Sequence, residues 1–311
     1  MAIRFLRKAA AMLERHRTGC LIVSCAGLFG ANLAFHIFPE QTCRTLYQAW
    51  AKGKPVEPSE RLLRLFSEVL SDVTVETDKG YQAFVTFSFH PVSAGLPWLP
   101  AGCVVGIPAN FGSSAKDESE ISAHVIVIKG KEVDWESPEG LALKEALTLS
   151  PAAQKFAIAR EIVYVKNHSP LICAAIAPVF LAGTYGSAVA MKGLLGLYSG
   201  PVQLRGLCNI VVLALGYVGY CLSYDTVSQA ADYRADRNTA TISTDFARGG
   251  VEFYNKILSQ NQTFRTLMGK QGKKIYAPNG NLFPRHWIRF KHASYTSRRD
   301  LIINILNMPQ A

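Results

Sequence analysis

The fold is decided by residues 150–236, which are predicted to form a helix, two long apolar segments and a second helix. The first helix contains AREIVYVKNH at residues 159–168 and ends with that stretch. We expect it to begin at Pro151 with Ser150 as its N-cap, because a hydroxyl accepts from the free N–H groups there and proline fits the first helical position. The second helix contains ADYRADR at residues 231–237. How the two helices meet depends on the segments between them.

Three segments are long and apolar enough to cross a membrane. Residues 19–38 carry no acid and no strong base, and residues 169–191 and 206–224 carry no charged side chain. About 20 apolar residues span the roughly 30 Å core of a bilayer. The last two segments form a hairpin, 169–224, which returns the chain to the side it left, so both helices face one compartment. The alternative is a hairpin buried in a soluble core, and uncharged runs of 23 and 19 residues argue against it.

The order of helix, membrane hairpin and helix resembles the HtpX-like and CAAX-prenyl membrane metallopeptidases. Those proteins have an H-E-x-x-H helix, a membrane hairpin, and a third zinc ligand in an E-x-x-x-D pattern. Here Arg160, Glu161 and Tyr164 stand at the three positions of the first motif, and Asp232 and Asp236 at those of the second. The resemblance implies an α+β membrane protein with three transmembrane helices and a degenerate zinc-metallopeptidase-like domain that the hairpin splits.

The ligand positions carry the wrong chemistry for zinc. Two imidazoles at i and i+4 lie on one helical face and can converge on one ion. Arg160 puts a permanent cation there instead, and Tyr164 offers a phenol whose ordinary pKa is about 10. Asp232 is one methylene shorter than glutamate. We therefore predict a pseudoenzyme with no catalytic residue, no metal and no cofactor. The alternative is that the match is accidental and the helix is an ordinary solvated one.

Arg160 is expected to replace the zinc as a structural cation that pairs with Asp232 across the two helices. Tyr164 shares the face of Arg160 and would cap the pocket, while Glu161 would point elsewhere. The rival hypothesis is an active or residual metallopeptidase of membrane-protein quality control with unusual ligands. His168 lies seven residues after Glu161 and could share its face, so that ligand set would be Glu161, His168, Asp232 and Asp236.

The rest of the chain completes a mixed domain in two parts, residues 39–168 and 225–311. Helices are predicted at 57–72, from Ser137-Pro138, at 227–240 and at 250–258, strands at 83–89 and 124–128, an exposed acidic loop at 113–120, and a hairpin at 275–283. Residues 93–108 form a loop punctuated by Gly and Pro that feeds an apolar strand, which predicts a hairpin of the core sheet. Residues 292–302 resemble the H-P-x-x-x-x-R-I start of the helix that closes the peptidase fold, without its proline.

The net charge of +10 is concentrated near the C-terminus: residues 253–299 contain ten basic residues and no acidic one. Nucleic acid is not a predicted partner, because the aromatic residues in this stretch show no stacking-module pattern. Anionic lipid headgroups, an acidic partner and a merely solvated basic face stay open. The candidate lipid or partner contacts are Lys270, Lys273, Lys274, Arg285, Arg289, Lys291, Arg298 and Arg299.

The cysteines and the N-terminal tail give weaker signals. None of the seven cysteines forms a C-x-x-C pair, and Cys43 could bridge Cys103, although buried free thiols are the better interpretation. Residues 1–18 form a basic tail with five basic residues against one acid. That composition is typical of a mitochondrial address and equally of the basic flank of a signal anchor.

Six blocks carry a second resemblance along essentially the whole chain, to the vertebrate transmembrane protein 177 family. They are RHRTG (15–19), SCAGLFG (24–30), PVSAG (91–95), AQKFA (153–157), GGVEFY (249–254) and YTSRRD (295–300). The resemblance implies a multi-pass protein of the mitochondrial inner membrane without catalytic residues. It further implies a role in the early maturation of cytochrome c oxidase subunit II.

The partners that this second resemblance implies are subunit II, its assembly chaperones and inner-membrane lipid. In that membrane, positive-inside bias favours the N-terminal tail and the hairpin loop in the matrix. The folded domain would then lie in the intermembrane space.

Overall fold

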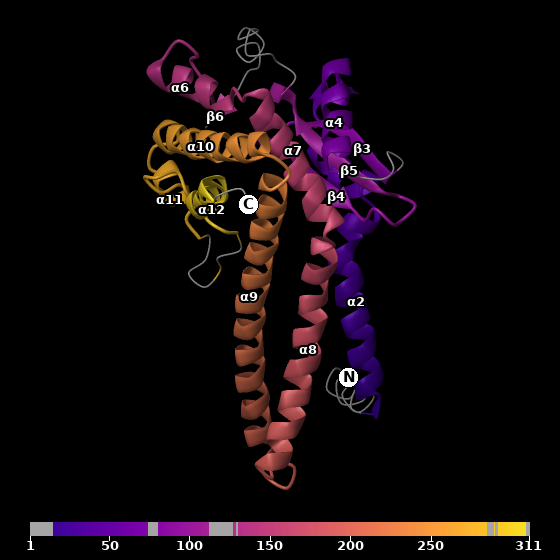
Figure 1. Ribbon diagram of the computed structural model, residues 1–311. Coiled ribbons are helices and arrows are strands. Elements are labelled where there is room, and N and C mark those ends of the chain that lie inside the picture. Colours follow the sequence, from indigo (N-terminus) through magenta and orange to yellow (C-terminus); the bar gives the residue numbers. More distant parts are fainter. Residues whose placement is uncertain are drawn as a thin grey trace. The chain divides into compact units, whose positions relative to one another are not determined.

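The computed structural model describes residues 15–73, 80–111, 127–128, 130–284, 289 and 292–308. The chain divides into two compact units (Figure 1). The helical unit comprises Met1–Ala34 and Pro170–Val227, and the mixed unit comprises Phe35–Ser169 and Ser228–Ala311. The acidic loop predicted at 113–120 and the first part of the strand predicted at 124–128 lie outside the described residues.

Three long helices correspond to the predicted spans: α2 (Arg17–Ile37), α8 (Ser169–Leu194) and α9 (Val202–Ala240). Each is long and apolar enough to cross a membrane, and only 6%, 11% and 17% of their most apolar windows are buried within the protein. Such exposed apolar surface is stable when lipid covers it. The spans are therefore confirmed as helices. The separate helix predicted at 227–240 is wrong, because α9 continues through those residues without a break.

Small residues let α8 and α9 approach closely within the helical unit. A Cβ on Gly216 would lie 2.1 Å from Thr184 Oγ1, and one on Gly219 would lie 3.0 Å from the ring of Phe180. In lipid, helices associate mainly through such close packing, because no hydrophobic force drives apolar helices together there. The hairpin is thus held by contact between its own arms.

The mixed unit contains a three-stranded sheet in the order β3-β5-β4. β3 (Tyr81–Thr86) pairs in parallel with β5 (Cys103–Pro108), and β4 (Val92–Gly95) pairs antiparallel with β5. The hairpin of the core sheet before residue 108 is confirmed. The strand predicted at 83–89 ends earlier, because Thr86 Oγ1 accepts from the N–H of Ser88 and the chain turns there.

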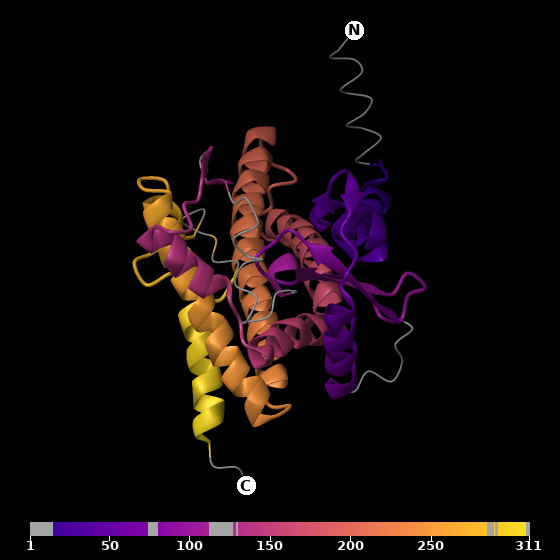
Figure 2. The same cartoon turned by 90° about the horizontal axis from the view of Figure 1, so that it is seen from above.

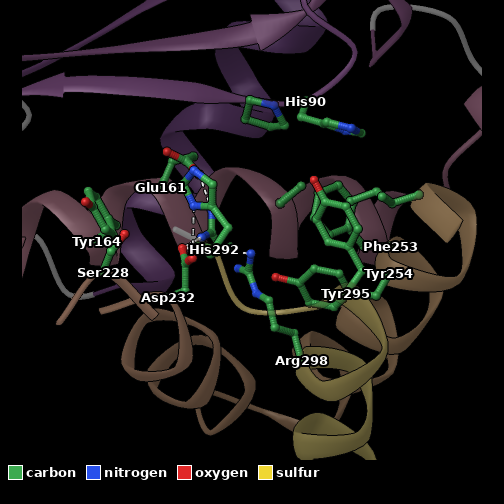
Figure 3. A pocket seen from close by; sticks show the side chains of 14 residues that line it. His90, Glu161, Tyr164, Ser228, Asp232, Phe253, Tyr254, His292, Tyr295 and Arg298 are labelled. Atoms are coloured by element: carbon green, nitrogen blue, oxygen red, sulfur yellow. Dashed lines mark hydrogen bonds and ion pairs between the residues drawn. The ribbon is translucent and has the colours of Figure 1, made fainter. Parts of the chain in front are cut away.

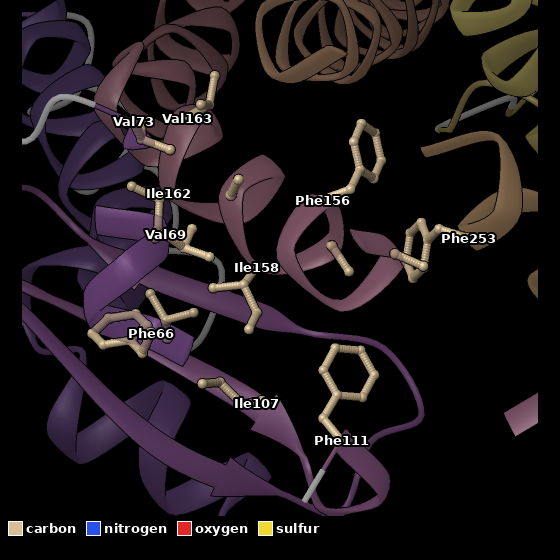
Figure 4. Close-up of a cluster of buried hydrophobic side chains, with 14 of the residues drawn as sticks. Phe66, Val69, Val73, Ile107, Phe111, Phe156, Ile158, Ile162, Val163 and Phe253 are labelled. Carbon is tan, nitrogen blue, oxygen red and sulfur yellow. The ribbon is translucent and has the colours of Figure 1, made fainter. Parts of the chain in front are cut away.

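Helices α4 (Glu60–Asp72) and α7 (Pro151–Lys166) pack on this sheet (Figure 4). Ser150 accepts from the N–H of Ala153 and Pro151 is the first helical residue, as predicted. The helix ends at Lys166, two residues early, because His168 adopts a left-handed φ of 55° before α8 starts. The shared core contains Phe66, Val69, Ile107, Phe111, Phe156, Ile158 and Ile162, each at most 5% exposed.

A second helical layer is formed by α6 (Pro138–Leu147), α10 (Thr244–Leu267) and α12 (Tyr295–Asn307). α10 packs on α6, α7 and α12, and Figure 2 shows α12 alongside it. Close contact with α7 requires glycine, since a Cβ on Gly249 would lie 2.3 Å from the carbonyl oxygen of Ala152. The helix predicted from Ser137-Pro138 is confirmed, whereas the one predicted at 250–258 is longer.

The remaining described elements are short. They are η1 (Glu40–Arg44), α3 (Thr45–Tyr47), β1 (Trp50–Ala51), β2 (Lys54–Pro55), η3 (Ala109–Phe111), β6 (Val127–Ile128), β7 (Lys131–Glu132) and α11 (Gly272–Ile275). Cys43 and Cys103 are buried free thiols, and burial raises the pKa of each to about 12. The hairpin predicted at 275–283 exists, closed by a bridge between Tyr276 and Leu282.

Candidate functional site

Arg160 on α7 binds three carboxylates, two of which lie on the C-terminal part of α9. Its Nη2 donates to Asp232 Oδ1 at 2.6 Å and its Nε donates to Asp236 Oδ1 at 3.0 Å. The predicted pair of Arg160 and Asp232 is therefore confirmed. The expectation that Glu161 points elsewhere is wrong: it accepts from Arg160 Nη1, and its other oxygen accepts from Ser93 Oγ on β4 at 2.7 Å.

A second arginine completes this network from α12. Arg298 Nε donates to Asp236 Oδ2 at 2.6 Å, and its Nη2 donates to Asp236 Oδ1 at 2.9 Å, which is the bidentate geometry that guanidinium favours. The Tyr254 hydroxyl donates to the same Oδ1 at 2.7 Å. Asp236 is fully buried and Arg298 is 5% exposed. Arg298 is therefore not the lipid or partner contact predicted from its charge.

The network holds two guanidinium groups among three carboxylates and joins α7, α9 and α12. Burial opposes the ionisation of Asp232, but a hydrogen bond from His292 and the charges of Arg160 and Arg298 outweigh it and hold its pKa below the usual range. Asp232 thus stays charged, and each arginine is paired with carboxylates. The arrangement fixes three helices relative to one another.

A cavity of about 270 Å³ lies beside the network. Figure 3 shows Tyr164 and Ser228 at one end and Phe253, Tyr254 and Tyr295 at the other. Tyr164 lines this pocket, as expected of a residue on the face of Arg160. Of the lining residues, His90 and Tyr254 were not predicted from the sequence. His90 follows β3 in a bend, where no periodic pattern places it.

His90 is held neutral in this pocket. Burial and, to a lesser extent, the positive charges of Arg160 and Arg298 lower its pKa from 6.5 to about 4, against a backbone hydrogen bond at Phe89 that raises it. The imidazole stands edge-on to the ring of Phe253, 6.2 Å between centroids. The pocket thus offers aromatic rings and a neutral imidazole next to a saturated ion network.

The rival ligand set is not assembled. Within the described part of the chain, no group of three or more His, Cys, Asp or Glu side chains is placed to hold a metal ion. His168 is exposed beyond the end of α7 and does not line the pocket, while Glu161, Asp232 and Asp236 all pair with arginine. A donor set neutralised by guanidinium does not fit a zinc ion.

The other predicted contacts of the basic stretch fall in different surroundings. Lys270, Lys273 and Lys274 are exposed around α11, and Arg289 is half-buried. Arg299 donates to Asp300 at 2.8 Å and to Asn255 at 3.3 Å. The positions of Arg285 and Lys291 lie outside the described residues.

Fold and site together define a membrane protein of mixed α and β structure with three candidate spans and a buried arginine–carboxylate network. The family model described as Transmembrane protein 177 matches residues 119–285. The protein of that name from Danio rerio is 49% identical to the chain, over 98% of the chain and 98% of its own length. The one from Xenopus laevis is 51% identical, over 98% of the chain and 99% of its own length. The one from Homo sapiens is 47% identical, over 96% of both. This chain belongs to the transmembrane protein 177 family. No solved structure matches it.

The names of these relatives denote no enzyme, which fits the predicted absence of catalysis.

Replacing Arg160 with alanine should destabilise the mixed unit by about 3–5 kcal/mol, because it leaves the buried Asp232 and Asp236 with one guanidinium and the half-buried Glu161 with none. The measurement is the apparent melting temperature of the full chain in mild detergent. Arg44→Ala is the matched control: its ion pair with Glu40 spans 3.1 Å at a half-exposed i,i+4 position, which is worth about 0.5 kcal/mol. Equal melting of Arg160→Ala and wild type would contradict a structural role for this cation.

Lowering the pH from 7 to 5 should destabilise the protein through His90. The unfolded chain protonates this residue near 6.5 and the folded protein only near 4, so the unfolded state binds more protons between those values. The loss is about 2 kcal/mol over this interval. The His90→Phe variant should lose less stability between pH 7 and pH 5, in melting curves recorded across that range. If the His90→Phe variant loses as much stability between pH 7 and pH 5 as the wild type does, the imidazole of His90 is not held neutral.

Proposed function

We propose that this chain is a non-catalytic assembly and stabilising factor of the mitochondrial inner membrane. It acts in the early maturation of cytochrome c oxidase subunit II and stabilises the membrane chaperone dedicated to that subunit. Support comes from the resemblance to the transmembrane protein 177 family along essentially the whole chain. The observation that carries the non-catalytic part is Arg160, whose guanidinium is saturated by Glu161, Asp232 and Asp236 where a zinc enzyme would hold its metal.

The scaffold is that of a membrane metallopeptidase that has lost its site. Support comes from the helix–hairpin–helix order of α7, α8 and α9 and from the positions that the network joins. Asp236 stands at the Asp of the E-x-x-x-D pattern, and Arg298 stands at the Arg of the H-P-x-x-x-x-R-I pattern. The two form a bidentate ion pair. A fold built around a metal would keep this pair as support after losing the ligands themselves.

The pocket is where an unassembled client segment would be held. It has room for a side chain or two, with aromatic rings for apolar contact and the Ser228 and Tyr164 side chains for polar contact. Nothing in it needs to move a proton or polarise a bond. Binding without turnover requires only this shape and these contacts.

The stability of newly made subunit II tests the proposal. In cultured vertebrate cells that lack the endogenous relative, pulse-labelled subunit II should decay at least twofold faster, and re-expression of this chain should restore it. Glu161→Gln should restore it as well, because an amide oxygen still accepts from Arg160 while a general base is removed.

Two outcomes would contradict the proposal. Unchanged decay of subunit II without the protein would remove its role in maturation. Failure of Glu161→Gln to restore subunit II, at a protein level equal to wild type, would favour the peptidase.

The orientation is part of the same proposal. The N-terminal tail and the loop at residues 192–205 lie in the matrix, and the mixed unit lies in the intermembrane space. A C-terminal epitope should become protease-sensitive when the outer membrane is opened, whereas an epitope in the loop should stay protected until the inner membrane is lysed. The reverse pattern would invert the topology.

A further inference from the structure

We propose that residues 270–283, which we call the basic hairpin, form a binding site for anionic phospholipid headgroups at the membrane surface. This inference does not depend on the proposed function. It rests on how the hairpin is built, what holds it, and which side chains it leaves exposed.

The hairpin is closed by backbone hydrogen bonds. The N–H of Phe283 donates to Ile275 O at 2.8 Å, and the N–H of Ala277 donates to Asn281 O at 2.8 Å. Tyr276 and Leu282 form the bridge between the two arms. Ile275, Leu282 and Phe283 are thereby brought to one end of the hairpin, although six residues separate the arms in sequence.

Contacts from α10 and α12 hold the hairpin in place. Asn261 Nδ2 on α10 donates to Gly280 O at 2.8 Å, and Arg265 Nη1 donates to Tyr276 O at 2.9 Å. Asn281 Nδ2 donates to Thr296 Oγ1 on α12 at 2.9 Å. Gly280 has a φ of 84°, and a Cβ there would lie 2.3 Å from the carbonyl oxygen of Leu258. The hairpin is therefore a fixed platform and not a loose loop.

The anchored hairpin leaves three apolar side chains exposed to solvent. Leu282 is 47% exposed, Phe283 is 46% exposed and Ile275 is 36% exposed. The neighbouring Tyr276 instead packs inward against Phe264, with 6.2 Å between ring centroids. An aromatic and two aliphatic side chains held outward on an anchored turn indicate a surface that is covered when the protein is in its own environment.

Three lysines lie just before these apolar side chains in the chain, around α11. Lys270, Lys273 and Lys274 are exposed, and no carboxylate of the described residues forms an ion pair with them. The sequence carries no acidic residue from 253 to 299, so no anion from this stretch screens them. Arg265 and Arg298 point inward to their own acceptors. Within the described part of the chain, no carboxylate neutralises these three lysines, and an external anion would fit them.

An anionic bilayer surface satisfies both features at once. Lysine heads near an anionic leaflet are attracted to its headgroups, each worth about 1 kcal/mol, and apolar side chains enter the boundary between headgroups and acyl chains. The chain tethers the mixed unit to any bilayer that the three candidate spans cross. An acidic protein would use the lysines but would have to supply its own apolar pocket as well, so the lipid surface is the occupant that we infer.

Hydroxyl-radical footprinting of the full chain in nanodiscs tests this site. The discs contain either phosphatidylcholine alone or phosphatidylcholine with about one third phosphatidylglycerol. Oxidation of Phe283 and Leu282 should fall roughly threefold or more in the anionic discs and recover at high salt, because the lysine attraction is screened. Leu63 and Leu141, which are 45% and 55% exposed on α4 and α6, should react equally in both.

A matched pair of charge reversals makes the test specific. Lys273→Glu with Lys274→Glu should abolish the protection of Phe283. Lys52→Glu with Lys54→Glu, which reverses two exposed lysines on the β1–β2 turn, should leave that protection intact. None of these four lysines forms an ion pair with a carboxylate of the described residues, and melting curves check that both variants fold.

Equal oxidation of Phe283 in the two kinds of disc would overturn the proposal, as would equal loss of protection in the two double variants. Lysine crosslinks to an acidic protein in mitochondria, with no lipid protection in the discs, would assign the surface to that protein instead.

Discussion

The mixed unit depends on the buried carboxylate of Asp236, which forms ion pairs with both Arg298 and Arg160. A charged group moved from water into a protein interior loses several kcal/mol of hydration free energy. Only ion pairs and hydrogen bonds of good geometry offset that loss. Asp236 has no exposed surface, yet two guanidinium groups and the Tyr254 hydroxyl saturate it. Because these partners come from three helices, the network forms only when all three are in place. Helix packing and charge pairing are thus one cooperative event.

The membrane hairpin explains why such a network is needed. α7 and the part of α9 that carries Asp232 and Asp236 are separated by residues 169–224, and that segment contributes its own packing in a different solvent. Close contact of Gly216 with Thr184 holds the two arms of the hairpin together. A contact of this kind does not by itself fix how far the C-terminal part of α9 is rotated about the helix axis. Ion pairs of defined geometry fix that rotation, because a guanidinium meets carboxylates only along its planar N–H directions. The network therefore sets the register of α9 against α7.

Capping residues and hydropathy patterns, which depend on neighbours in sequence, predicted much of this fold. Contacts between residues far apart in sequence were mostly missed. Ser150 and Pro151 set the start of α7 by capping chemistry that involves neighbours only, and the apolar spans follow from length and charge alone. The pair of Arg160 and Asp232 was predicted from a resemblance of the two helices to metallopeptidase motifs, and the contact itself is present. Arg298 was not, because a run of ten basic residues predicts an average charged surface. Which member turns inward depends on the register of α12 against α9, and no periodicity in the run specifies it.

An arginine at the centre of a carboxylate cluster makes different demands on a fold from those of a bound metal ion. A zinc site ties folding to metal supply and to pH, since its ligands must be deprotonated to bind. A guanidinium is always charged and is part of the chain, so the cation arrives with the polypeptide and stays at every physiological pH. Each of its three nitrogens donates a hydrogen bond to a different carboxylate: Nε to Asp236, Nη1 to Glu161 and Nη2 to Asp232. Arg160 thus acts as a structural cation that needs no bound ion and links α7 to the C-terminal part of α9.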